Sequence, residues 1–175
     1  MISRCAVLLA VLGAVPAVDA NIVTSVQTTS VSLQPAGKLS VPSGVALVSS
    51  GAAFSSYSGS TQLNYRARTS SSGSATITLQ ASGAFTPSGG PSLTSGQLTY
   101  TCSGATLGTG CSGTQTVSSS SQTSVVSIPS GVCMGGPGCS TPNPAQLNLL
   151  YQLENDPASP TGSCSVTVLL TISSL

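Results

Sequence analysis

Apolar and polar residues alternate with a period of two along several segments of this chain. In residues 75–81 (ATITLQA), every second residue is apolar and the residues between are Thr or Gln. This alternation is typical of a β-strand that turns one face to the core and the other to solvent. Three more segments show it clearly, 62–69, 146–154 and 164–172, and weaker candidates are 37–41, 45–48, 97–102, 114–117 and 123–128.

Clusters of Ser, Gly and Pro, such as SSGS and TPSGGPS, separate these segments and indicate turns. No stretch keeps the 3.6-residue spacing of an amphipathic helix for more than one turn. The pattern therefore predicts an all-β protein, a single β-sandwich with immunoglobulin-like or Greek-key connections. We assign this domain to residues 35–175.

Residues 1–20 have the features of a secretory signal peptide. Arg4 precedes an apolar run from Cys5 to Val18, and the segment ends on the small residue Ala20. The run is shorter than the roughly 20 apolar residues that span a bilayer, which argues against a membrane anchor. We therefore expect cleavage after Ala20 and a secreted mature protein without a membrane span.

Residues 21–34 (NIVTSVQTTSVSLQ) form an uncharged N-terminal extension that ends before Pro35. Two interpretations are open. The extension is either the first strand of the domain's own sheet or a strand donated to a neighbouring chain, because it lacks the charges and prolines that usually protect an edge strand. The apolar residues that a neighbour would receive are Ile22, Val23, Val26, Val31 and Leu33.

Five cysteines follow the leader, in a compartment where disulfides persist. Cys102 and Cys111 enclose a short Gly-containing segment, as do Cys133 and Cys139, so we expect these two pairs to form disulfides. Cys164 is left over, either buried as a small apolar residue, which we favour, or joined to another chain. A zinc site is not favoured, because the chain has no His and neither spacing is Cys-x-x-Cys.

The composition excludes most catalytic chemistry. Only 4% of the residues are charged and none is His, so a hydroxyl or thiol nucleophile lacks its usual base. The two acidic residues after the leader, Glu154 and Asp156, lie in a sequence typical of a turn rather than of a glycosidase cleft or a calcium site. We predict no enzyme activity, no metal and no cofactor. The net charge of +1 also gives no basic surface for nucleic acid.

The two ends of the chain carry a resemblance to a known family. Gly162 is the fourteenth residue from the C-terminus, and it precedes the alternating residues Cys164, Val166, Val168, Leu170 and Ile172. With the N-terminal extension, this pattern resembles the fimbrial (pilus) subunits of the chaperone–usher class. The chain departs from that family in having Ser174 where an aromatic residue is usual, and in having no Cys before Cys102 in the mature chain.

The resemblance implies a sandwich that lacks one strand. The terminal strand, with Gly162, Val166, Val168, Leu170 and Ile172, would flank an acceptor groove, and residues 21–33 of the next subunit would fill it. It further implies a head-to-tail homopolymer, a cell-surface filament, and an export chaperone and usher as partners. The alternative is a monomeric secreted adhesin or carbohydrate-binding module, for which Tyr57 is the one aromatic residue that we expect to be exposed.

Overall fold

The computed structural model describes residues 6–8, 27–42, 44–133 and 144–174. The chain divides into two units, Met1–Gln34 and Pro35–Leu175. In the first unit, β1 (Ala6–Leu8) pairs antiparallel with β2 (Thr28–Ser30). The described part of the second unit holds ten strands: β3 (Ala36–Ser40), β4 (Val48–Ser49), β5 (Tyr57–Arg68), β6 (Ala75–Ala81), β7 (Leu98–Ser103), β8 (Thr109–Gly110), β9 (Gln115–Thr116), β10 (Thr123–Ile128), β11 (Ala145–Leu153) and β12 (Val168–Ser174).

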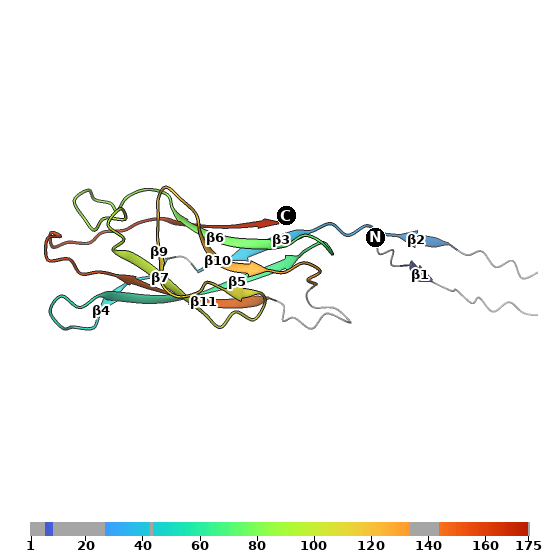
Figure 1. Ribbon diagram of the computed structural model, residues 1–175, viewed down its shortest axis with the longest axis horizontal. Helices are drawn as coiled ribbons and strands as arrows, with labels where there is room; N and C mark the ends of the chain where they lie inside the picture. The colour runs from blue at the N-terminus through green and yellow to red at the C-terminus, as the bar shows by residue number, and fades with distance from the viewer. Residues whose placement is uncertain (1–5, 9–26, 43, 134–143, 175) are drawn as a thin grey trace, which may run out of the picture. The chain divides into compact units, whose positions relative to one another are not determined.

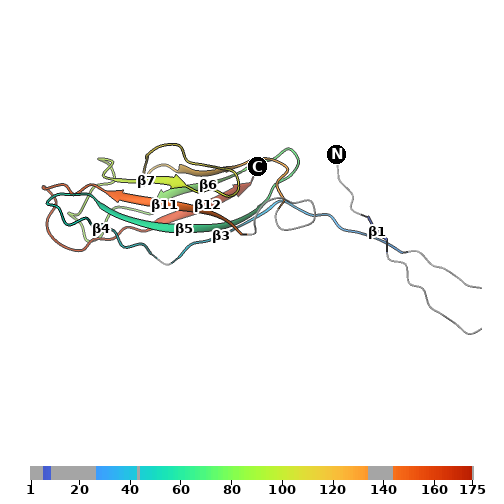
Figure 2. The ribbon, with the colours of Figure 1, turned by 90° about the horizontal axis from the view of Figure 1, so that it is seen from below.

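The strands of the second unit form two antiparallel sheets that pack face to face. One sheet has the order β12-β6-β10-β8, and the other has the order β3-β5-β11-β7-β9 with β4 also paired to β5. Figure 2, seen from below, shows β5, β11 and β3 in the layer nearer the viewer and β6 and β12 behind them. The predicted all-β sandwich is therefore confirmed.

The core lies between the sheets and is made by the apolar face of each alternating segment. All the apolar residues of β6 are buried, and β11 alternates buried and exposed residues along its whole length. The rings of Tyr100 and Tyr151 lie 6.2 Å apart between their centroids. Burial, and to a lesser extent Tyr100, raises the pKa of Tyr151 to about 12. The largest fully buried side chains are Tyr65, Tyr100, Leu63, Ile77, Leu79, Ile128, Leu147, Leu149, Val117, Val125 and Val126.

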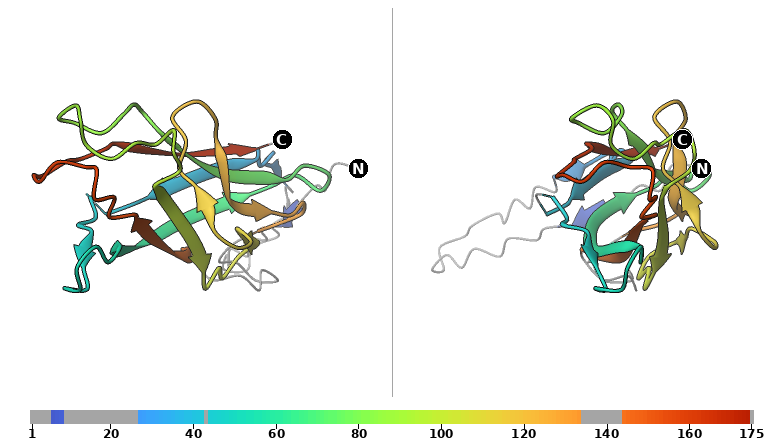
Figure 3. Two further views of the ribbon diagram at one scale, coloured as in Figure 1. Left: turned by 60° about the vertical axis from the view of Figure 1, so that its left-hand side comes forward. Right: turned by 90° about the vertical axis from the view of Figure 1, so that its left-hand side faces the viewer.

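The two sides of the sandwich differ. On one side, a disulfide joins Cys102 of β7 to Cys111, which follows β8, with the Cα atoms 5.3 Å apart. Because β7 and β8 belong to different sheets, this bond closes that side. On the other side, β3 ends one sheet order and β12 ends the other, so two edge strands face each other there. Figure 3 shows β3 beside β12 in both views.

Candidate functional site in the seam between β3 and β12

The edge strand β12 carries the predicted acceptor residues. It pairs antiparallel with β6, with Ile172 opposite Ile77 and Val168 opposite Ala81. Before β12 begins, Ser165 forms an isolated bridge with Thr86. Among the described strands, none pairs with the other edge of β12. A sheet edge presents backbone N–H and C=O groups that need partners, so this edge can pair with a further strand if there is space beside it.

The inward face of this C-terminal segment is only partly covered. Val166, Val168, Leu170 and Ile172 pack against the core, yet each is half-buried, whereas the inward residues of β6 are fully buried. The alternation of the sequence is therefore present in the structure without the complete burial that usually accompanies it. Covering these half-buried apolar side chains with another surface would lower the free energy further.

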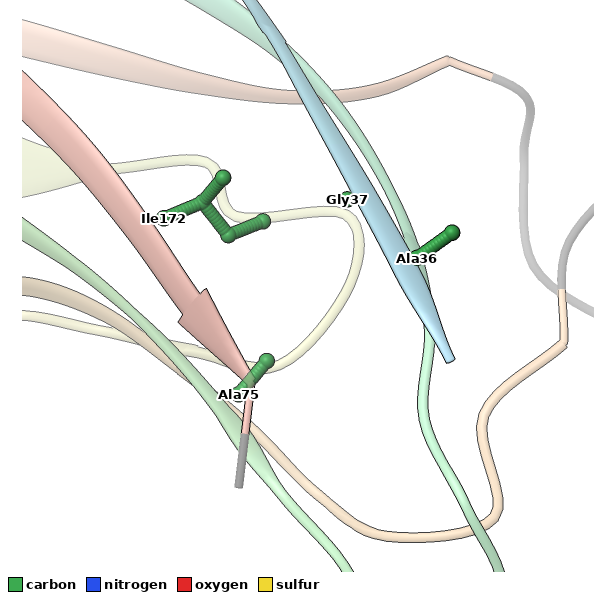
Figure 4. A pocket seen from close by; sticks show the side chains of 4 residues that line it. All are labelled: Ala36, Gly37, Ala75 and Ile172. Carbon is green, nitrogen blue, oxygen red and sulfur yellow. The ribbon is translucent and has the colours of Figure 1, made fainter. Parts of the chain in front are cut away.

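The edge strand β3 lies beside β12 but belongs to the other sheet. The two strands come close at Gly37, where an added Cβ would lie 2.8 Å from Cδ1 of Ile172 and 3.2 Å from its Cγ1. Figure 4 shows Ile172 directed toward Gly37. These two residues line a hollow of about 80 Å³ together with Ala36 and Ala75. We call this region, β3 with β12, the seam. Nothing in the alternating pattern marks Gly37 as a contact residue, although a glycine inside a strand often marks a close approach of backbone.

The predicted donor residues lie partly outside the described residues. Ile22, Val23 and Val26 fall there, whereas Val31 is 64% exposed and Leu33 is 67% exposed. Within the extension, β2 pairs with β1, which consists of residues of the expected leader. Cleavage after Ala20 would remove β1 and leave β2 without this partner.

Gly162 lies apart from the strand that the resemblance assigns to it. It is exposed, six positions before Val168 begins β12, and no atom lies within 4 Å of the position that a Cβ would take. Its backbone φ of 155° falls in the region that favours glycine. In this structure Gly162 serves the connection between β11 and β12 rather than the seam.

The cysteines follow the expected pairing in part. The disulfide between Cys102 and Cys111 is present. Cys133 is also disulfide-bonded, while Cys139, the partner that we predicted for it, lies outside the described residues. Cys164 is a free thiol and is exposed, so the expectation that it is buried is wrong. It lies four residues before Val168 begins β12.

The aromatic residues contradict one expectation. Tyr57 begins β5, is half-buried and packs against the core, so it does not offer the exposed ring that we expected. The exposed ring is Phe54, which is 65% exposed in the loop between β4 and β5. Its φ of 56° is unusual for a bulky residue. A carbohydrate-binding site built on an exposed Tyr57 ring is therefore not supported.

Charged side chains lie at the two ends of the sheet that contains β5. Lys38 of β3 stands directly opposite Arg66 of β5, and both are exposed. They line a hollow of about 410 Å³ together with polar residues that include Asn64 and Gln146. At the other end, the Gln97 amide donates a 2.9 Å hydrogen bond to Asp156, which also accepts one from the Ala158 backbone. The prediction of a turn after β11 is thus confirmed.

The described residues contain no group of three or more His, Cys, Asp and Glu side chains close enough to share a metal ion. Nor do they include a helix with the length and apolar character needed to cross a membrane. No protein-family model matches the chain, and no curated protein or solved structure matches it significantly.

Proposed function

We propose that this protein is a structural subunit of an extracellular filament, in which the N-terminal extension of one copy adds a strand to β12 of the next. The observation that carries the proposal is the seam. Its C-terminal strand has a free edge and an apolar face that is half-buried. A donated strand would pair with that edge and cover that face at the same time.

The extension suits this role by length and chemistry. Residues 21–33 span about 44 Å when extended. Residues 165–174, alongside which they would lie, span about 34 Å, so the extension is long enough. The extension carries no charge, and its described apolar residues Val31 and Leu33 have little cover in their own chain. Burial of about five such side chains yields on the order of 10 kcal/mol. Association costs oppose part of this gain.

Strand addition also requires the seam to open. A strand that pairs with β12 must lie about 4.8 Å from it, in the space that β3 takes up where Gly37 meets Ile172. The contact between Gly37 and Ile172 would therefore be exchanged for contacts with the donated strand. Each copy donates its extension to one neighbour and accepts the extension of another. Such head-to-tail association does not close on itself, so the assembly grows as a filament.

The proposal places the protein outside the cell. Export would remove residues 1–20, freeing β2 from β1 and releasing the extension for a neighbour. An export chaperone that covers the seam would prevent premature assembly, because an exposed sheet edge otherwise pairs with any available strand.

The test compares two purified proteins, residues 21–175 and residues 35–175. We expect filaments in negative-stain electron microscopy from the first and monomers from the second. A synthetic peptide of residues 21–34 should bind the shorter protein and protect the β12 amides from hydrogen exchange. The control peptide has the same composition in scrambled order. Filaments from the shorter protein, or equal binding of both peptides, would contradict the proposal.

A further inference from the structure

The five charges of residues 35–175 are segregated along the sandwich. Lys38, Arg66 and Arg68 lie on β3 and the second half of β5. Glu154 and Asp156 follow Leu153, which pairs with Tyr57 at the start of β5. Figure 2 shows these two ends of β5, one near β3 and the other near β4. We call them the cationic end and the acidic end.

The two ends are too far apart to neutralise each other within one copy. Arg66 and Tyr57 are nine residues apart on one strand, which corresponds to about 30 Å. Charges on a protein surface are largely screened beyond about 8 to 10 Å in physiological salt. The exposed charges of Lys38 and Arg66 at one end and of Glu154 at the other can therefore act on another molecule.

The cationic end favours an anionic partner. Lys38 and Arg66 are directly opposite each other across the pairing of β3 with β5, and like charges in that arrangement destabilise a sheet. A carboxylate that approaches both cations would relieve this repulsion. The nearby hollow adds the side-chain amides of Asn64 and Gln146 as hydrogen-bond donors.

The acidic end offers such a carboxylate and an apolar contact. Glu154 is exposed, and its backbone N–H donates to the Gln97 carbonyl, so the position of the residue is fixed while its side chain is accessible. Phe54 is 65% exposed in the loop that precedes Tyr57. An exposed aromatic ring in the loop before Tyr57, which pairs with Leu153, also suits a Lys or Arg side chain, which can contact the ring face.

We infer that the acidic end of one copy binds the cationic end of a second copy, with Glu154 and Phe54 against Lys38 and Arg66. This inference rests on the proposed filament. The extension joins the sandwich at Pro35, directly before β3, and so leaves from the cationic end. A copy seated with this end against the acidic end of its neighbour can run its extension back along β12. That strand follows the acidic residues in the chain, and its Ile172 lies beside Gly37 near the cationic end.

The contact guides association rather than supplying most of its free energy. Charge complementarity between two proteins mainly raises the association rate, and salt weakens the effect. We therefore expect Glu154→Gln to slow polymerisation of residues 21–175 about tenfold at low ionic strength and hardly at all at about 0.5 M salt. Asn148→Lys, in the middle of the same sheet face, changes the net charge by the same amount and should leave the rate unchanged.

The decisive experiment is a charge exchange followed by light scattering. Glu154→Lys alone and the pair Lys38→Glu with Arg66→Glu should each slow polymerisation, and the three changes together should restore most of the rate. Asp156 is left unchanged because it holds the turn. A combined variant as slow as the single ones, or single variants equal to the wild type at low salt, would overturn the inference. Absence of polymerisation by the wild-type protein itself would instead contradict the proposed function.

Discussion

Gly37 of β3 and Ile172 of β12 meet across the edges of two different sheets, so closely that a Cβ on Gly37 would lie 2.8 Å from Ile172 Cδ1. The contact joins residues that are 135 positions apart, near the two ends of the sandwich sequence. It lies between two strands that do not pair through their backbones.

We expect Gly37→Ala to destabilise the monomer, residues 35–175, by about 1 kcal/mol, because the added methyl group overpacks the seam. Ile172→Val removes the Cδ1 atom that the methyl group would strike. The two changes together should therefore cost less than the sum of their separate effects. Urea unfolding of the four proteins measures this coupling, and additive costs would show that the contact is not tight.

The disulfide between Cys102 and Cys111 should stabilise the opposite side of the sandwich. A closed loop of this length contributes about 2 to 3 kcal/mol by restricting the unfolded chain. We expect replacement of both cysteines by Ala to lower the free energy of unfolding by that amount. Cys164→Ser, which changes an exposed free thiol, is the matched control and should have no measurable effect.

The buried Tyr151 should make stability depend on pH under alkaline conditions. Burial raises its pKa from the ordinary tyrosine value of 10.0 to about 12 in the folded state. Its contribution is therefore complete below pH 10 and is lost as the pH rises from 10 to 12, by about 2 to 3 kcal/mol. Chemical unfolding across this range should show a smaller decline for Tyr151→Phe than for the wild type. Equal declines would show that ionisation of Tyr151 does not contribute.

The extension can be tested without disturbing the sandwich. Leu33 is exposed in its own chain, so Leu33→Asp should leave the monomer as stable as before. If Leu33 enters the groove of a neighbour, the same change buries a carboxylate and should reduce polymerisation by 100-fold or more. Ser32→Asp adds the same charge one residue earlier, on the opposite face of the extended chain, and should be tolerated far better.

The sequence allowed most of the sandwich to be predicted but little of the seam. The range of β6 matches the predicted one. Its apolar residues are buried and its polar residues are less buried, as the alternation predicts. The two-residue strands β8 and β9 are too short to show a period, and β8 was missed. The half-burial of Leu170 depends on what lies beside β12, and the exposure of Phe54 depends on its loop. Neither property follows from local alternation.

The charge segregation was also present in the sequence but could not be recognised there. Lys38 and Arg66 become neighbours only through the pairing of β3 with β5, and Glu154 is placed at the far end only through the register of β11. The predicted turn at Glu154 was local and could be read directly. The position of that turn relative to the cations needed the topology of the sheet.

A reversible covalent lock on the seam tests the central claim most directly. With Gly37→Cys and Ile172→Cys in a Cys164→Ser background, the new Cβ at position 37 would lie 3.2 Å and 3.3 Å from the positions of the two γ carbons of Ile172, which is close enough for a disulfide to form. We expect the oxidised protein, residues 21–175, to remain monomeric and to form filaments after reduction. The single-cysteine variants, treated with the same reductant, should form filaments in both states. Filament growth by the locked protein at the wild-type rate would contradict strand addition at β12.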